Sequence, residues 1–293
     1  MKNKILACLL IGLLSVNIWA DDKQKSMAEL SKELSNPLAQ IWNISVMYNY
    51  QTIKGDMVDG KDHMNVGVFQ PVLPIPMGDE YTFFARPVIP FIEGPTGVGV
   101  TGGTPSNPVG HGTNRSFDIG DMMLPIGMGV VKKEGWSWGG GVTFILPTSQ
   151  NDLLGSHQWQ AGPTALALWA NKDWTIGTHM QHWWGFAKAS GFDEYETKYA
   201  NHTDIQYFVI KNLPNAWQVR MSPHATVDWN APSGEQWTVP IGLGIGKMIK
   251  IGPMPVMLMA EYQKSIIKPD SVGNDSTIML QVNFIIKNPF GDL

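Results

Sequence analysis

Hydrophobic and polar residues alternate along several stretches of this chain. Between positions 217 and 229 the odd-numbered residues are apolar or aromatic, whereas the even-numbered ones are Gln, Arg, Ser, His, Thr and Asp. The same split recurs at 42–51 and 277–286. Successive side chains of a β-strand point to opposite faces, so a period of two predicts strands with one apolar face and one polar face.

Twelve strands follow from this pattern and from the turn residues between them. Short turns, such as 132–135 and 171–173, alternate with mostly longer loops, of which 93–114 and 188–202 are the longest. This alternation is typical of even-stranded outer-membrane barrels. We predict an all-β fold, a closed antiparallel transmembrane β-barrel of about 12 strands; ten or fourteen would also fit the pattern. The predicted strands are 41–53, 63–75, 80–92, 115–131, 136–147, 158–170, 174–187, 203–212, 216–229, 235–249, 255–267 and 275–287.

Paired tryptophans favour the membrane barrel over a soluble sandwich, whose half-buried strands would alternate in the same way. Three pairs are separated by ten, ten and twelve residues, so both members of each pair share a face. Ten residues tilted by about 45° span roughly 23 Å, close to the ~25 Å apolar band of such barrels. The predicted aromatic girdle comprises Trp42, Trp136, Trp159, Trp169, Trp174, Trp184, Trp217, Trp229 and Trp237.

Eight prolines lie inside the predicted strands, where each removes one donor from the hydrogen-bond ladder. Because an unmet backbone carbonyl is costly in lipid, we expect these prolines near bulges, gaps or strand ends. They are Pro71, Pro74, Pro87, Pro90, Pro125, Pro163, Pro223 and Pro240.

The N-terminal 20 residues have the features of a secretory signal peptide. Lys2 and Lys4 precede an apolar run that ends at the small residue Ala20. Export through this segment would place the mature chain in the cell envelope, and the barrel pattern then predicts the outer membrane and its lipid as the surroundings.

A short helix is predicted between the signal peptide and the barrel. Within the periplasmic segment 21–40, Ser26 and Glu29 form a capping-box pattern that begins a helical stretch. The helix either packs against the periplasmic rim of the barrel or plugs its lumen, and the pattern leaves both arrangements open. The barrel itself is assigned to residues 41–293.

Composition adds two exclusions. The chain of 293 residues is 43% hydrophobic and 16% charged, against roughly 25% charged in an average soluble domain. Its one cysteine, Cys8, lies in the signal peptide, so no disulfide is expected. The net charge is −4, or 19 − 25 = −6 after loss of Lys2 and Lys4, and only three residues are Arg. Nucleic-acid partners need basic surfaces, so none is predicted.

Several motifs are spread over nearly the whole mature chain. They include Asn36-Pro37-Leu38-Ala39, QPVLP at 70–74, RPVIP at 86–90, GSHQWQAGPTAL at 155–166 and QWTVP at 236–240. With these motifs the chain resembles the bacterial barrel family called MetA-pathway of phenol degradation, also labelled "transporter" or, by misnomer, bacterial "neuromedin U". The resemblance implies an outer-membrane barrel that passes small organic molecules, and it carries over no catalytic or ligand residues. The chain departs from such barrels at its end, where Phe290 would replace a terminal aromatic residue.

The polar face of the predicted strands brings ionisable side chains into the lumen. They could form an ion-pair and amide network that fills the interior, because buried charges must pair. Alternatively, they could line a polar path with a constriction that orients passing solutes, beside a lane of inward glycines. The candidate lumen residues are Arg86, Asp121, His179, Arg220, His224, Asp228 and Glu261, and the glycines are Gly139, Gly141, Gly242, Gly244 and Gly246.

Catalytic and metal sites have weaker support. Ser222, His224 and Asp228 share one strand face, as a membrane hydrolase would need. Residues two apart on a strand are separated by about 7 Å at Cα, which is beyond hydrogen-bond reach. His179 and His182 point to opposite faces of one strand and cannot bind one metal ion. We therefore predict no catalytic residue, no metal and no cofactor.

The loops carry no ligand motif that would change this conclusion. The glycine-rich loop 93–114 lacks the Lys-Ser/Thr ending of a phosphate loop, and we expect it to be a mobile outside loop or a gate. The acidic loop 192–199 lacks regular calcium-binding spacing. Three functions follow: a channel for small, hydrophobic or aromatic organic solutes; a closed structural or binding barrel whose outer loops contact a partner; and, with least support, a membrane-embedded hydrolase.

Overall fold

The computed structural model describes residues 25–58, 60–78, 80–95, 115–151, 154–190, 198–286 and 288–289. The predicted signal peptide, most of the glycine-rich and acidic loops, and Phe290 lie outside these residues.

The described residues form one α-helix, sixteen strands and a short 3-10 helix. The helix is α2 (Met27–Leu34), and the 3-10 helix is η1 (Pro214–Ala216). Within these residues, no helix is both long and apolar enough to cross a membrane. The strands are β1 (Trp42–Lys54), β2 (Asp62–Val72), β3 (Ile75–Pro76), β4 (Tyr81–Ala85), β5 (Ile89–Pro95), β6 (Arg115–Ile119), β7 (Met122–Val130), β8 (Gly135–Leu146), β9 (Gln158–Ala170), β10 (Trp174–Lys188), β11 (Asn201–Leu213), β12 (Trp217–Met221), β13 (His224–Asp228), β14 (Trp237–Ile251), β15 (Met254–Ile267) and β16 (Gly273–Ile286).

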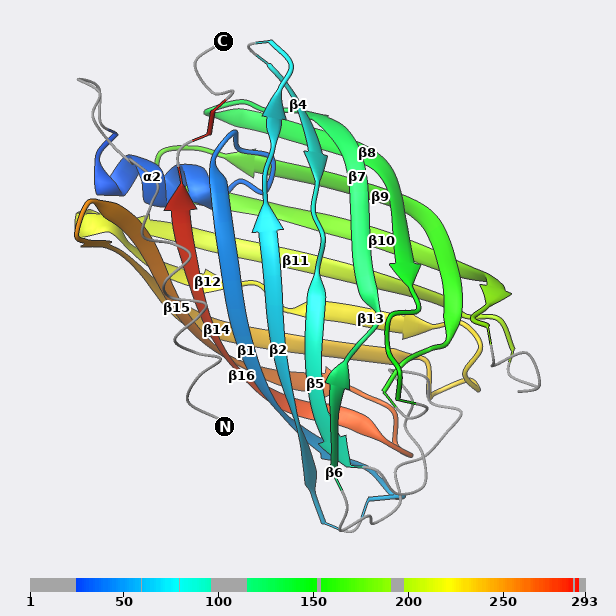
Figure 1. The fold of residues 1–293 in the computed structure, drawn as a ribbon. Coiled ribbons are helices and arrows are strands. Elements are labelled where there is room, and N and C mark those ends of the chain that lie inside the picture. The colour runs from blue at the N-terminus through cyan, green and yellow to red at the C-terminus, as the bar shows by residue number, and fades with distance from the viewer. Residues whose placement is uncertain are drawn as a thin grey trace.

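The sixteen strands make twelve passes along the barrel wall. Four passes are each broken into two strands, namely β2 with β3, β4 with β5, β6 with β7, and β12 with β13, so 16 − 4 = 12. All pairings are antiparallel, and β16 pairs with β1 so that the sheet closes on itself (Figure 1). The predicted closed barrel of about 12 strands is therefore confirmed.

The prolines mark the places where the ladder is interrupted. Pro74, Pro87 and Pro223 lie at three of the four strand breaks, and Pro240 lies at a register shift between β14 and β15. Pro163 belongs to one of the two pairs that are missing from the β9–β10 ladder. The expectation that prolines sit near gaps and strand ends is confirmed for these five.

One seam of the wall is unpaired over a longer distance. Passes two and three pair at 65–69 with 89–93 and again at 75–76 with 82–83, in one unchanged register. No ladder pair of the described residues joins 70–74 to 84–88 between them, a stretch of roughly 16 Å. Pro71 and Pro87 stand opposite each other in this register, and neither has an N–H to donate.

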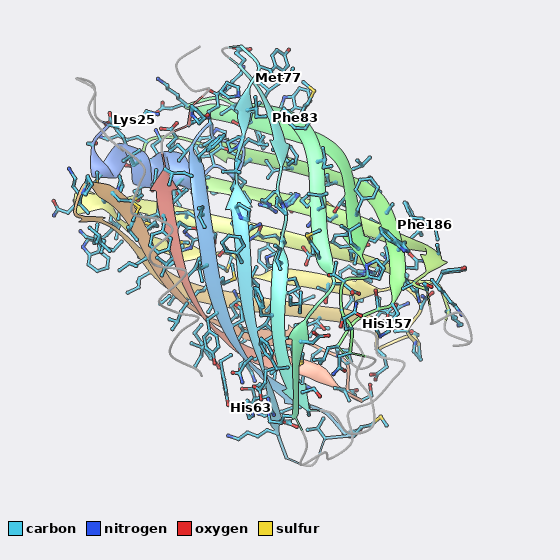
Figure 2. All side chains as sticks on the ribbon, in the orientation of Figure 1. Lys25, His63, Met77, Phe83, His157 and Phe186 are labelled. Atoms are coloured by element: carbon cyan, nitrogen blue, oxygen red, sulfur yellow. The ribbon has the colours of Figure 1, made fainter. Side chains whose placement is uncertain are left out.

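The two ends of the barrel differ, and we call them the turn end and the loop end. The turn end carries the start of β1, the end of β16 and the short turns, such as 131–134. The loop end carries the long connections. Figure 2 shows Lys25 and Met77 near the turn end and His63 at the loop end.

The alternation predicted from the sequence sorts side chains onto the two faces of the wall. In β12, Trp217 and Val219 are exposed on the outside, whereas Gln218, between them, is fully buried. In β14, Leu243 and Ile245 are exposed, whereas Gly244 is buried.

The apolar core of the barrel lies inside its turn end. One cluster packs α2 and Ile41 against inward residues of β14, β15 and β16, and the second packs Leu38 against inward residues of β9 and β11. The first cluster contains Leu30, Ile41, Ala216, Met248, Met257, Met259 and Ile285, and the second contains Leu38, Leu166, Leu168, Ala170, Phe208 and Ile210. Of the two arrangements left open for the helix, the described contacts are those of a plug.

Candidate functional site in the barrel lumen

Glu261 organises one polar group on the inner wall. It accepts hydrogen bonds from the backbone N–H and the hydroxyl of Ser222, both at 2.9 Å, and the Arg220 guanidinium lies 3.9 Å away. The break between β12 and β13 frees the Ser222 N–H from the ladder, so the carboxylate replaces a lost backbone partner. A Cβ at Gly242 would lie 2.6 Å from a Glu261 oxygen, so this inward glycine makes room for the carboxylate.

His224 forms a second polar group with Asp204, which sequence reasoning did not single out. The Nδ1 atom of His224 lies 2.9 Å from Asp204 Oδ1 on the neighbouring strand β11. The His224 side chain is 48% exposed although it points inward. The lumen is therefore wide enough here to hold water. Asp204 could have been predicted as a lumen residue from its position on the polar face of β11.

Arg86 and His179 meet across the lumen although they come from different walls. Arg86 lies at the break between β4 and β5, and its terminal nitrogen is 3.3 Å from His179 Nδ1 on β10. The other ring nitrogen of His179 is 2.8 Å from the Thr164 hydroxyl. Within the described ranges, no carboxylate lies at ion-pair distance from Arg86.

Asp121 and Asp228 lie away from these groups, near the loop end. Asp121 accepts hydrogen bonds from the N–H and hydroxyl of Ser156, both at 2.6 Å, and thereby holds the loop that follows β8. Asp228 accepts from the N–H of Asn230 at 2.9 Å and shapes the turn after β13. The seven candidate lumen residues are therefore split between three lumen groups and two loop anchors.

A plug formed by residues 26–41 is the feature of the lumen that sequence reasoning did not resolve. The Gln218 amide donates to the Ser31 carbonyl at 2.9 Å and to the Ser35 hydroxyl at 2.8 Å, which ties α2 to the inner wall. Leu30 and Leu38 are 3% and 2% exposed. The sequence signals were the capping box of Ser26 and Glu29, which predicted the helix and left a plug open, and the motif around Pro37 and Leu38.

The structure does not bring the hydrolase candidates together. Ser222 bonds to Glu261, His224 bonds to Asp204, and Asp228 bonds to its own turn. Across the described part of the chain, no group of three His, Cys, Asp or Glu side chains could hold one metal ion.

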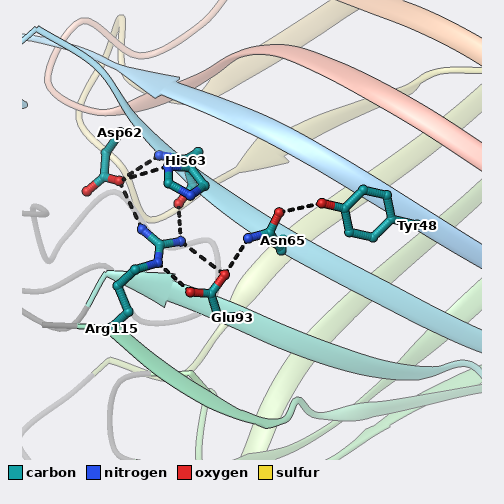
Figure 3. Close-up of polar contacts among 6 residues, drawn as sticks. All are labelled: Tyr48, Asp62, His63, Asn65, Glu93 and Arg115. Carbon is teal, nitrogen blue, oxygen red and sulfur yellow. Dashed lines mark hydrogen bonds and ion pairs between the residues drawn. The ribbon is translucent and has the colours of Figure 1, made fainter. Parts of the chain in front are cut away.

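A polar cluster at the loop end links four strands through side chains that sequence reasoning did not single out. Arg115 on β6 bonds to Glu93 on β5, to Asp62 at 3.2 Å and to the His63 carbonyl at 2.8 Å (Figure 3). Asn65 donates to Glu93 and accepts from the Tyr48 hydroxyl at 2.6 Å, which extends the cluster to β1. We call Tyr48, Asp62, His63, Asn65, Glu93 and Arg115 the rim cluster.

Two loops at this end are joined by Glu235. Its carboxylate accepts from the Ser271 hydroxyl at 2.6 Å and from the Ser271 N–H at 3.1 Å. These hydrogen bonds hold the pKa of Glu235 below its ordinary value, because they favour the charged form.

The nine predicted girdle tryptophans lie near strand ends. Six of the nine have exposed side chains. Two of the nine have a lysine ammonium over the ring: Lys211 lies 5.1 Å from the centroid of Trp174, and Lys247 lies 4.9 Å from that of Trp217. Those nearer the turn end are Trp42, Trp136, Trp169, Trp174 and Trp217, and those nearer the loop end are Trp159, Trp184, Trp229 and Trp237.

Comparisons with known proteins address the fold. No family model and no curated protein matches the chain, so the resemblance to the MetA-pathway family stays a prediction. Among solved structures, an outer membrane channel from Pseudomonas putida F1 matches with a TM-score of 0.58 and 13% identity, over 84% of this chain and 95% of that chain.

Other solved structures match less closely. The NanC porin matches with a TM-score of 0.48 and 10% identity, over 83% of this chain and 99% of that chain. A Pseudomonas aeruginosa FadL homologue matches with a TM-score of 0.39 and 10% identity, over 86% of this chain and 93% of that chain. Together with the closed twelve-pass sheet, the Pseudomonas putida match shows that this chain has the fold of an outer-membrane β-barrel.

Proposed function

We propose that this protein is an outer-membrane channel that takes up small organic solutes, with hydrophobic or aromatic solutes as the favoured class. The observation that carries the proposal is the exposure of His224 inside the barrel, because a side chain that is 48% exposed there needs a water-filled lumen. Thr226 and Gly141 are also exposed on inward positions. The likeness in fold to a channel adds to this support.

In this proposal the barrel sits in the membrane with its turn end toward the periplasm, as is usual for such barrels. Export would use the predicted signal peptide. The tryptophans near the two ends would lie at headgroup level as an aromatic girdle, with Lys211 and Lys247 facing lipid phosphates.

The solute path would begin at the loop end and pass the polar groups of Asp204, His224 and Glu261. At the turn end the plug closes the lumen with Leu30 and Leu38. A solute could therefore reach the periplasm only when the plug moves, and we propose that the plug is the gate.

Conductance in planar bilayers tests this function. We expect the mature chain to show small or intermittent currents, and a variant lacking residues 26–40 to show larger and steadier ones. Lys25→Ala is the matched control, because Lys25 precedes the plug and its one ion pair in the described part of the chain is to Glu33 of α2, at 2.6 Å. Electrical silence of both the mature chain and the deletion variant, together with impermeability to solutes in liposomes, would refute the channel.

The sealed turn end favours a second function, that of a closed structural or binding barrel. Its lumen would stay packed, and its loops would contact a partner. Under this alternative, removal of residues 26–40 would destabilise the barrel without producing current. A hydrolase remains the weakest hypothesis; it predicts that Ser222→Ala abolishes ester hydrolysis by the purified protein.

A further inference from the structure

The three arginines of this chain have different electrostatic surroundings. Arg115 contacts two carboxylates in the rim cluster, and Arg220 lies beside Glu261. Arg86 lies on the inner wall, and the one hydrogen bond that its guanidinium makes among the described residues is to His179 at 3.3 Å. Among the described residues, Arg86 is thus the arginine without a carboxylate partner.

His179 does not compensate the charge of Arg86. A guanidinium has no acceptor, so the Nδ1 atom of His179 must accept the hydrogen bond. The ring proton then lies on Nε2, where it is donated to the Thr164 hydroxyl at 2.8 Å. The imidazole is neutral in this arrangement. The nearby acid Asp204 contacts His224 instead, so among the described residues no carboxylate contacts the Arg86 guanidinium directly.

The surroundings of Arg86 are mostly apolar. A hollow of about 20 Å³, room for roughly one water molecule, lies between Arg86 and the plug. Its apolar lining includes Leu38, Val72, Phe84 and Leu166. Leu38 belongs to the plug, whereas the other three belong to the wall, so a plug side chain borders the space beside the cation.

The barrel wall at Arg86 lacks hydrogen-bonded pairing on one side. Arg86 and Val72 stand opposite each other in the unpaired seam between passes two and three, and no ladder pair of the described residues joins them. The Arg86 N–H donates to the Pro125 carbonyl at 3.0 Å on the other side. The guanidinium therefore projects from a strand that is held along one edge only at this height.

We propose that Arg86, oriented by His179, is the binding site for the carboxylate of a small hydrophobic acid, and that Leu38 occupies the apolar part of the site until such a solute displaces it. A planar guanidinium matches a carboxylate through two parallel hydrogen bonds. This site rests on the proposed function, because it requires the lumen to be a solute path. It adds the class of solute, a small hydrophobic acid, and the residue that keeps the gate closed, Leu38.

Calorimetric binding to the full mature protein in detergent, in low-chloride buffer, tests the site. The probes are benzoate and its neutral isostere benzamide. We expect benzoate to bind the wild type at least about 10-fold more tightly, because a hydrogen bond to a charged group contributes that order of affinity. Arg86→Gln should abolish the preference, and the matched control Arg115→Gln should retain it. Leu38→Ala should strengthen benzoate binding several-fold, because the competing side chain is removed.

The proposal would be overturned if the wild type bound benzoate and benzamide equally. It would also be overturned if neither the wild type nor Leu38→Ala bound either probe. Neither outcome depends on whether the Arg86→Gln variant folds. Retention of the preference in Arg86→Gln would also overturn the proposal. Binding in detergent does not depend on conduction. A protein that binds benzoate selectively but is silent in bilayers would refute the channel and keep the site, whereas conduction without this preference would refute the site alone.

Discussion

The two ends of the barrel are stabilised in different ways. At the turn end, an apolar segment of the same chain fills the lumen, with Leu30 and Leu38 almost fully buried. At the loop end, charged and polar side chains join neighbouring strands and loops, as in the rim cluster and the Glu235–Ser271 contact. Apolar packing is not directional, so in the proposed channel it would allow the plug to leave the lumen and return. Polar contacts require every partner in place, so the loop end is suited to a fixed shape.

The largest effect is expected from weakening the plug. A Leu30→Ala, Leu38→Ala double variant removes one buried side chain from each apolar cluster, and such changes cost about 2–5 kcal/mol each. We expect backbone amides of α2 to lose protection from hydrogen exchange by two or more orders of magnitude. Amides at the loop end should keep theirs. Equal loss of protection at both ends would show that the plug and the loop end unfold together and would remove the distinction.

A smaller effect is expected at the rim cluster. Arg115→Gln leaves Glu93 and Asp62 without their shared cation, at a site where all three side chains are about a quarter to a third exposed. Because solvent screens such a site, we expect a loss of about 1 kcal/mol in denaturant unfolding of the detergent-solubilised barrel. Arg115→Lys is the control, since it keeps a cation beside the two carboxylates, and it should recover part of the lost stability. A variant as stable as the wild type would show that the cluster is dispensable.

The smallest effect is a pH dependence confined to the loops. The pKa of Glu235 is lowered in the folded chain, so the contact contributes fully above the unfolded pKa of about 4.3 and is lost as pH falls through the lower folded value. Hydrogen exchange of the Ser271 amide should therefore accelerate, relative to the intrinsic rate, between pH 5 and pH 3. Glu235→Gln should remove this acceleration. If the Ser271 amide still exchanged faster at low pH in Glu235→Gln, the pH dependence would belong to another ionisable group.

Much of the wall could be predicted because alternation depends only on neighbours along the chain. Trp217 and Val219 had to share a face, and so did Gln218 and Arg220, whatever lay beside them. The twelve passes and their short turns were predicted within a few residues. The strand breaks were only partly predicted. A proline shows that a backbone N–H is missing from the ladder, but it does not show which neighbouring strand loses that hydrogen bond.

The partners within the site could not be predicted in the same way. Asp204 meets His224, and Arg86 meets His179, because of the stagger between strands and the closure of the sheet. Arg115 contacts Glu93 although a long loop separates the two residues in the sequence. Such contacts depend on register, which a one-residue shift would change for a whole strand.

The amino-acid sequence by itself determined which side chains face out and which face in, since a strand turns each residue opposite to the one before it. Only the tertiary structure decided that residues 26–41 enter the lumen and that passes two and three stay unpaired at 70–74. It also decided that, within the described ranges, no carboxylate contacts the Arg86 guanidinium. These features depend on how distant segments meet when the sheet closes, and closure is a property of the whole barrel rather than of any one strand.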